Sequence, residues 1–215
     1  MFMTTIVLIA KEPLPGKVKT RLHPALSYEQ AAELAAASID DTLATLAQLP
    51  ATRRILAFDG ERIPCAAAGY EVLPQSAGTL DQRLGAIFDY AEGPTILVGM
   101  DTPQVAVSDL AAAFKAWPTG LDAWFGPAND GGFWALGMAR PTGDLIRGVP
   151  MSQDDTGAIQ FSRLRQAGLS VGLLPRLTDV DEIADAHEVA SLAPSTLFAS
   201  TLARMTGVRV PELVA

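Results

Sequence analysis

Four basic side chains follow the first apolar segment of the chain. Residues 6–10 are apolar without a break, and the loop after them carries Lys11, Lys17, Lys19 and Arg21. An apolar run without alternation is typical of a strand that is covered on both faces. Ligands of open α/β sheets bind beyond the carboxyl ends of the strands, so cations gathered there indicate a phosphate or pyrophosphate site. The alternative is a solvated surface loop, because short basic clusters are common on protein surfaces.

An acidic side chain ends the clearest buried strand in the middle of the chain, which is expected at residues 94–103. This residue, Asp101, is a candidate ligand for magnesium or manganese. Hard cations prefer carboxylate oxygens, and one or two acids often hold them together with the oxygens of a substrate diphosphate. The alternative is a carboxylate that caps the following turn by accepting from a nearby backbone N–H.

A second acidic residue lies in a turn between two expected strands. Asp130 is followed by a pair of glycines and is flanked by the apolar segments 122–127 and 133–137. An Asp-Gly-Gly turn between two strands is typical of a hairpin. It also occurs where a ligand or another segment approaches the backbone closely. The aromatic residues of these strands, Trp124, Phe133 and Trp134, are expected in the core.

A polar loop at residues 75–78 precedes the expected N-terminus of a helix. Thr79 and Gln82 have the spacing of a capping box. The free N–H groups of a first helical turn can bind an anion or meet the edge of a base, so this loop is a candidate ligand contact. A turn with no ligand is an equal alternative.

The remaining pattern alternates strands with helices. A helix capped by Ser27 and Gln30 is expected to end before Pro50. Further strands are expected at 55–58, 70–73 and 171–174, and helices at 80–88, 110–117, 157–167, 182–192 and 194–205, with a loose tail at 208–215. This order predicts a three-layer α/β/α domain with a mostly parallel, Rossmann-like sheet. We expect a single domain over residues 1–215, in which the C-terminal helices cover about residues 182–206.

The composition restricts the partners. A net charge of −8 and a pI near 4.7 argue against a nucleic-acid or anionic-membrane surface, because both need a broad basic face. No apolar run approaches the length of a membrane span, and no signal peptide is recognisable, so a cytoplasmic protein is expected. The single cysteine, Cys65, excludes a disulfide framework and is expected to be a small core thiol.

Several of these segments together resemble a known family. The basic segment 11–22, Gly99-Met100-Asp101-Thr102-Pro103, the segment 126–133 and Asp179-Val180-Asp181 occur in the order seen in bacterial glycosyltransferase-like proteins of the arsenosugar-biosynthesis type. The resemblance spans about residues 4–192. It implies the GT-A fold of the nucleotide-diphospho-sugar transferase superfamily. The basic segment is also similar, more distantly, to that of phospholactate guanylyltransferases.

The resemblance implies roles for the candidate residues. A nucleotide would lie across the carboxyl edge of the sheet, with the phosphates held by Lys11, Lys19 and Arg21. The base would be held by the segment that contains Gln75, Gly78 and Thr79.

The resemblance also implies a metal site. Asp101 corresponds to the metal-binding aspartate of the fold, and Asp179 or Asp181 would supply a second ligand for Mg²⁺ or Mn²⁺. The chain departs from the family at three places: one acid stands in place of Asp-x-Asp, Met151 replaces a tryptophan, and residues 182–185 replace Thr-Pro-Glu-Asp.

Three functions are therefore consistent with the sequence. The first is a nucleotide-sugar-dependent glycosyltransferase, with Asp130 as the catalytic base and Asp101 on the metal. The second is a guanylyl- or cytidylyltransferase-like enzyme that releases pyrophosphate, and the third is a nucleotide-binding protein without transferase activity. The two histidines, His23 and His187, are expected to be solvated or structural. The sequence leaves the acceptor and the oligomeric state open.

Overall fold

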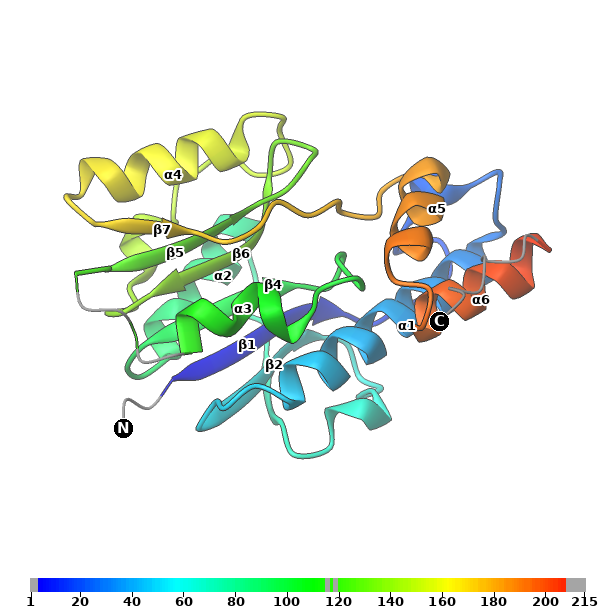
Figure 1. The fold of residues 1–215 in the computed structure, drawn as a ribbon, viewed down its shortest axis with the longest axis horizontal. Helices are drawn as coiled ribbons and strands as arrows, with labels where there is room; N and C mark the ends of the chain where they lie inside the picture. The colour runs from blue at the N-terminus through cyan, green and yellow to red at the C-terminus, as the bar shows by residue number, and fades with distance from the viewer. Residues whose placement is uncertain (1–3, 115–116, 118–119, 208–215) are drawn as a thin grey trace.

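The computed structural model describes residues 4–114, 117 and 120–207 (Figure 1). The strands are β1 (Thr5–Lys11), β2 (Arg53–Asp59), β3 (Glu71–Pro74), β4 (Thr95–Gly99), β5 (Ala123–Pro127), β6 (Phe133–Met138) and β7 (Val171–Leu173). The α-helices are α1 (Tyr28–Ala47), α2 (Leu80–Tyr90), α3 (Val107–Phe114), α4 (Thr156–Gln166), α5 (Ile183–Leu192) and α6 (Leu197–Thr206). Three short 3-10 helices are η1 (Thr20–Leu22), η2 (Cys65–Ala67) and η3 (Gly143–Leu145). None of the described helices has the length and apolar character needed to cross a bilayer.

The seven strands form one sheet in the order β3-β2-β1-β4-β6-β5-β7. β6 runs antiparallel to both of its neighbours, and the other strand pairs are parallel. The prediction of a mostly parallel α/β sheet is therefore confirmed. Because β1 and β4 are central and parallel, the loops that follow them lie at the same edge of the sheet.

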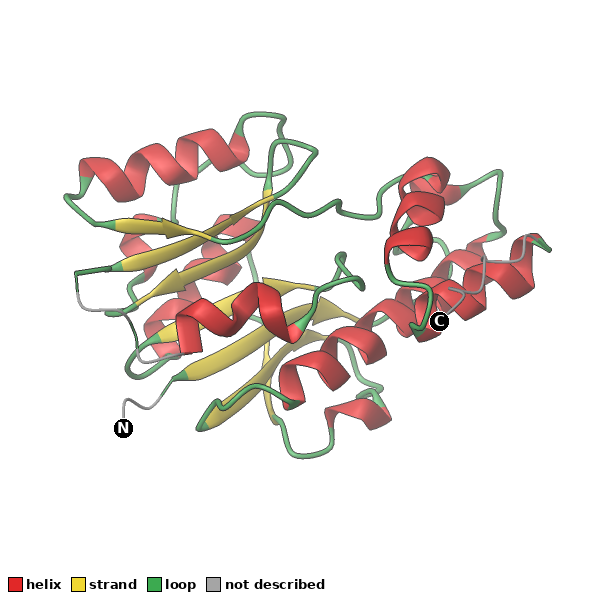
Figure 2. Cartoon of the chain, viewed as in Figure 1, coloured by secondary structure: helices red, strands yellow, loops and turns green. Residues whose placement is uncertain are grey.

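Both faces of the sheet are covered by helices, as Figures 1 and 2 show. Ile6 and Leu8 of β1 belong to an apolar cluster that includes residues of α1 and α3. Val7 belongs to the cluster on the opposite face, which includes residues of α2 and α4. Alternate residues of one strand are therefore buried on opposite faces, which explains the unbroken apolar run in the sequence.

A third apolar cluster lies beside the sheet. It joins α5 and α6 to the N-terminal half of α1 and to the basic loop through Leu22, Leu34, Val189 and Phe198, which are 1% exposed or less. Both oxygens of the Asp41 carboxylate accept N–H groups from the first turn of α6 at 2.9 and 2.7 Å. The C-terminal helices thereby hold the segment before α5 against the loop that follows β1.

Most sequence-predicted elements are present, with shifted ends. The capping boxes at Ser27 and Thr79 are confirmed. β4 ends at Gly99, so Asp101 lies in the turn beyond it, and α3 ends before Trp117. The expected tail at 208–215 lies outside the described residues.

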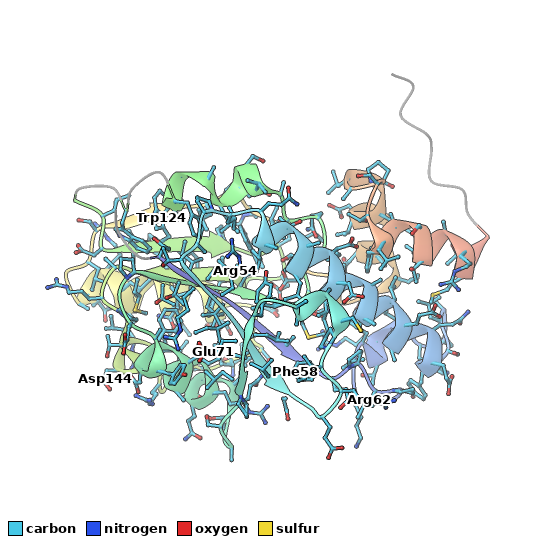
Figure 3. All side chains as sticks on the ribbon, turned by 90° about the horizontal axis from the view of Figure 1, so that it is seen from below. Arg54, Phe58, Arg62, Glu71, Trp124 and Asp144 are labelled. Carbon is cyan, nitrogen blue, oxygen red and sulfur yellow. The ribbon has the colours of Figure 1, made fainter. Side chains whose placement is uncertain are left out.

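The prediction for Cys65 is wrong. Its thiol is exposed in η2, because the short 3-10 turn buries Ala67 instead. The prediction for the tryptophans is confirmed: Trp124 is 6% exposed and Trp134 is 2% exposed. Figure 3 shows Trp124 at the end of the molecule that lies away from α5 and α6.

The turn between β5 and β6 is packed against the start of α4. The Gly157 N–H donates to the Gly131 carbonyl oxygen at 2.8 Å. Gly131 has a φ of 88°, and a Cβ added to it would lie 1.8 Å from the Asp154 carbonyl oxygen. Glycine is therefore required at this position for two reasons, its backbone conformation and the close approach of another segment.

Substituting Gly131 separates these two reasons. Gly120 has the same φ of 88° but no atom of the described residues within 4 Å of an added Cβ, so Gly120→Ala is a matched control. The control is expected to lower the free energy of unfolding by about 1–2 kcal/mol through the left-handed backbone alone. Gly131→Ala is expected to lower it by about 1–3 kcal/mol more, because two segments must move apart. Equal losses in urea unfolding would contradict the close packing of this turn.

Candidate functional site

A cavity of about 650 Å³ lies at the carboxyl edge of the sheet, beyond β1 and β4. Its polar and charged lining comes from loops that are far apart in the sequence, and it includes Lys11, Arg21, Gln75, Arg83, Asp101, Thr102, Asp130, Ser152, Gln153, Asp154, Thr156, Asp179 and Asp181. Its size falls within the usual range for small-molecule sites.

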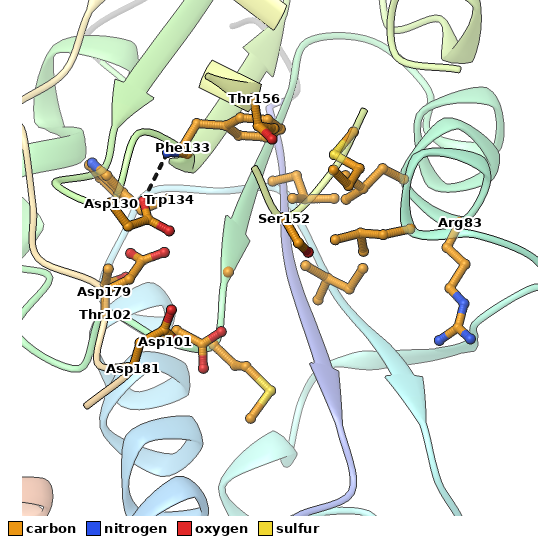
Figure 4. A pocket seen from close by; sticks show the side chains of 18 of the residues that line it. Arg83, Asp101, Thr102, Asp130, Phe133, Trp134, Ser152, Thr156, Asp179 and Asp181 are labelled. Carbon is orange, nitrogen blue, oxygen red and sulfur yellow. Dashed lines mark hydrogen bonds between the residues drawn. The ribbon is translucent and has the colours of Figure 1, made fainter. Parts of the chain in front are cut away.

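Four carboxylates gather along one side of this cavity, and Arg83 lies on the other side (Figure 4). They are Asp101, Asp130, Asp179 and Asp181, which we call the carboxylate cluster. Asp101 follows β4, Asp130 comes from the hairpin turn, and the other two come from the loop before α5. The structure therefore brings together all four acids that the sequence singled out.

Backbone and side-chain hydrogen bonds hold these segments together. The Val180 N–H donates to the Asp101 carbonyl oxygen at 2.9 Å. Asn129 Nδ2 donates to Thr178 Oγ1 at 2.7 Å, which joins the hairpin turn to the loop before α5. The Gly132 N–H donates to Asp130 Oδ1 at 2.8 Å and fixes the orientation of that carboxylate.

Lys19, which the resemblance implies to be a phosphate ligand, does not line the large cavity. It lines a neighbouring pocket of about 170 Å³, rather than the large cavity. Its ammonium lies 2.6 Å from Asp101 Oδ1 and 3.7 Å from Asp181 Oδ1, and it also donates to the Val180 carbonyl oxygen. Burial lowers the pKa of Lys19, but the Asp101 carboxylate and its hydrogen bond, followed by Asp181, raise the pKa above its ordinary value. Lys19 is therefore a charged group held by carboxylates.

Asp179 has the least favourable surroundings of the four acids. Burial raises the pKa of Asp179 to about 8, and the charges of Asp101 and Asp130 act in the same direction, while Lys19 opposes them. Asp179 Oδ1 is buried and has no hydrogen-bond partner among the described residues. This carboxyl group is therefore protonated near neutral pH.

Three basic side chains of the described residues also line the cavity. Lys11 is exposed at the end of β1, and Arg21, whose side chain is 71% exposed, lies 3.4 Å from an oxygen of Asp181. The third, Arg83, was missed by the sequence analysis. Its Nη1 donates to Asp59 Oδ2 at 2.9 Å, and its Nε donates to the Gly78 carbonyl oxygen at 3.0 Å. Its position in the first turns of α2, directly after the capping box, was the available signal.

The segment expected to hold the base is only partly in the cavity. Gln75 and Gly78 line it, whereas Thr79 is not among the lining residues and serves as the N-cap of α2. Gln75 Nε2 donates to the carbonyl oxygens of Ala10 at 2.8 Å and Ala57 at 3.0 Å. Because the backbone uses its donors, Gln75 presents a hydrogen-bond acceptor to a ligand.

Apolar residues form the rest of the cavity wall. Sequence reasoning had assigned Phe133 to the core, but it is only half-buried and lines the cavity with Leu80, Leu84 and Met151. The apolar pattern of the strand did not predict that Phe133 is partly exposed. The exposure of this side chain depends on the position of the loop before α4. Neither histidine lines the cavity, and His23 stacks on Tyr28 with ring centroids 4.9 Å apart.

The donor set of the cluster is suited to a hard cation. Among residues 4–114, 117 and 120–207, no three acidic, histidine or cysteine side chains are placed to hold a metal ion by themselves. The unpartnered Oδ1 of Asp179, beside the charges of Asp101 and Asp130, nevertheless fits a divalent ion that also takes oxygens from a substrate.

The raised pKa of Asp179 predicts a pH-dependent stability. Between about pH 4, the unfolded value, and about pH 8, the folded protein binds a proton that the unfolded chain has released. The contribution of this proton to the free energy of unfolding is fully present below about pH 4. It is lost as the pH rises towards about pH 8. Asp179→Asn should therefore gain stability relative to the wild type between about pH 5 and about pH 8, measured by urea unfolding in EDTA.

Asp144→Asn, at a carboxylate that is 89% exposed, controls for a surface substitution. The raised pKa of Asp179 would be contradicted if the unfolding free energies of the wild type and of Asp179→Asn changed in parallel between about pH 5 and about pH 8.

Similar solved structures share this fold. A protein from Desulfovibrio desulfuricans G20, provisionally named a nucleotide-diphospho-sugar transferase, has 27% sequence identity and a TM-score of 0.80, over 94% of each chain. A CMP:2-keto-3-deoxy-manno-octonic acid synthetase complexed with CTP has 13% identity and a TM-score of 0.55, over 89% of this chain and 98% of its own. Glucosyl-3-phosphoglycerate synthase from Mycobacterium tuberculosis, in complex with Mn²⁺, UDP and glucosyl-3-phosphoglycerate, has 11% identity and a TM-score of 0.50, over 96% of this chain and 81% of its own.

These likenesses confirm the predicted fold of nucleotide-diphospho-sugar transferases, and the two distant ones bear on the fold alone. No curated protein matches the sequence. A family model described as "Uncharacterized protein conserved in bacteria (DUF2064)" matches residues 42–153, more than half of the chain, and the protein belongs to that family.

Proposed function

We propose that the protein is a nucleotide-sugar-dependent glycosyltransferase whose donor binds in the 650 Å³ cavity. The observation that carries this proposal is the cavity itself, in which cations and a carboxylate cluster face the same space. A nucleoside diphosphate needs cations around its phosphates, and its transfer chemistry needs carboxylates nearby. The similar protein from D. desulfuricans, which is provisionally named a nucleotide-diphospho-sugar transferase, supports this assignment.

The diphosphate would be held by Lys11 and Arg21. Both line the cavity, and the exposed guanidinium of Arg21 has donors beyond its contact with Asp181. Arg guanidinium groups bind phosphate through paired, charge-assisted hydrogen bonds. The base would lie towards Gln75 and Gly78, and a base that donates a hydrogen bond would suit the acceptor oxygen of Gln75.

Asp101 and Asp179 would hold a divalent cation together with the diphosphate oxygens. Such an ion, Mg²⁺ or Mn²⁺, would neutralise the charge on the leaving diphosphate. The Asp179 side chain supports this role better than Asp181 does, because both oxygens of Asp181 face cations, Lys19 and Arg21. Asp101 is paired with Lys19 through Oδ1 alone. Asp179 would lose its proton when the cation binds, since metal ligation requires the ionised carboxylate.

Asp130 would act as the base on the acceptor hydroxyl. Its Oδ1 accepts the Gly132 N–H, so the carboxylate has a fixed orientation in the lining of the cavity. A positioned carboxylate that removes the proton from an attacking hydroxyl accelerates such reactions by about 10²–10⁴-fold.

Nucleotidyl transfer is the second candidate function. The fold likeness to a synthetase solved with CTP favours it, and the same cations and metal would then stabilise a leaving pyrophosphate. A nucleotide-binding protein without transferase activity remains the third reading.

The two transferase reactions release different products. With Mn²⁺, a sugar nucleotide and a panel of acceptors, we expect nucleoside diphosphate to accumulate, and Asp130→Asn should lower its rate of release by about 10²–10⁴-fold while leaving nucleotide binding intact. Accumulation of pyrophosphate from a nucleoside triphosphate and a phosphorylated acceptor would instead support nucleotidyl transfer. Binding with neither product would support the third reading.

Arg21 provides a direct test of the phosphate site. Arg21→Ala is expected to weaken binding of UDP, GDP or CDP by about 1.5–3 kcal/mol in calorimetry, because a charged hydrogen bond is lost. Arg62→Ala is the matched control: Arg62 is 82% exposed, pairs with a single carboxylate of Glu12 and does not line the cavity. Equal affinities in both variants would remove Arg21 from the site.

A further inference from the structure

Lys19 was expected to bind substrate phosphate, but its contacts indicate another role. An ammonium group has three N–H donors. The Lys19 Nζ has two oxygens within hydrogen-bond distance, Asp101 Oδ1 at 2.6 Å and the Val180 carbonyl oxygen, and it forms a longer ion pair with Asp181 Oδ1 at 3.7 Å. Its side chain is only 8% exposed. Its charge is therefore matched by protein oxygens, and the side chain does not line the large cavity.

Lys19 also reaches the carboxylate cluster from a different pocket than the one proposed to bind the substrate. Asp101 and Asp181 line both pockets, whereas Lys19 lines only the smaller one. The ammonium thus contacts these carboxylates from the smaller pocket. A substrate or a cation in the large cavity would meet the same carboxylates from a different direction.

The backbone holds Lys19 in this position. It has a left-handed conformation, with φ 47° and ψ 38°, which is uncommon for a residue other than glycine. The residues that anchor its loop, Val18 and Leu22, are each 1% exposed. The Leu22 N–H also donates to the Lys19 carbonyl oxygen at 3.0 Å. Turning the side chain towards the large cavity would break its ion pairs and leave Asp101 and Asp181 without their cation.

We propose that Lys19 is a positioning residue, an internal cation that holds Asp101 and Asp181 together from outside the large cavity, in the place that a second metal ion could take. It leaves phosphate binding to Lys11 and Arg21, and it leaves one divalent ion to be bound from the cavity side. The inference rests on the proposed function only in taking the large cavity as the phosphate site.

The first test is a Mn²⁺ titration of the nucleotide-free protein. Lys19→Met removes the internal cation but keeps the length of the side chain. It is expected to bind Mn²⁺ about tenfold more tightly than the wild type, or to bind one ion more, because two carboxylates lose their competing charge. A loss that was merely structural would not create metal binding. Affinity and stoichiometry that remain at or below those of the wild type would overturn the proposal.

The second test preserves net charge and uses inorganic pyrophosphate in EDTA. Lys19→Met/Asp101→Asn removes one charge of each sign from atoms 2.6 Å apart. Pyrophosphate affinity should stay within about threefold of the wild type, because no direct contact is lost and the distant field is unchanged. A loss of about tenfold or more would show that Lys19 is itself a phosphate ligand.

Arg21→Met/Asp181→Asn is the matched control, since it also removes a facing pair and preserves net charge. This control should weaken pyrophosphate binding by about tenfold or more if Arg21 binds phosphate. A control without effect, or a wild type that does not bind pyrophosphate, would refute the proposed phosphate site, and the Mn²⁺ titration would still decide the role of Lys19. If Lys19→Met alone does not fold, the pyrophosphate affinity of Lys19→Met/Asp101→Asn decides whether Lys19 binds phosphate.

Discussion

One buried ammonium group holds together segments of the chain that are far apart in the sequence. Lys19, in the loop after β1, contacts Asp101 beyond β4 and the segment before α5. Each of these segments is anchored elsewhere: the loop by Leu22 in the third apolar cluster, Asp101 by the Ser38 hydroxyl, which donates to the Met100 carbonyl oxygen at 2.6 Å, and the segment before α5 by that helix. The carboxylate cluster therefore depends on helices that lie outside the sheet.

The negative charge of the cluster is reduced in two different ways. Lys19 and Arg21 neutralise Asp101 and Asp181 by ion pairing. Asp179 has no such partner on its buried oxygen among the described residues, and it lowers its charge by holding a proton. Like-charged carboxylates cannot all ionise in so small a space unless cations are added. A site built in this way is suited to a ligand that brings a cation, because the cation replaces a proton.

The sequence predicted the sheet well because its signals are local. The apolar run of β1, the capping boxes of α1 and α2 and the Asp-Gly-Gly hairpin each depend on neighbouring residues. Asp101 and Asp130 were identified by their places after a strand and in a hairpin turn, and the family resemblance added Asp179 and Asp181. The sequence did not predict which charges pair with one another. Lys19 and Arg21 are two residues apart in the sequence, yet one is 8% exposed and the other 71% exposed, and this difference depends on the left-handed backbone at Lys19.

The single acid at the end of β4 is best understood together with this pairing. An Asp-x-Asp pair would supply two carboxylates from one turn, whereas this chain assembles its acids from the turn after β4, the β5–β6 hairpin and the loop before α5. Such an assembly needs bonds between those segments, and Asn129 with Thr178 and Val180 with Asp101 provide them. Any change that loosens one of these three segments moves carboxylates relative to one another, and Coulomb energies at these distances are sensitive to such movement. The fold therefore concentrates its hydrogen bonds between loops at the place where its charges are most crowded.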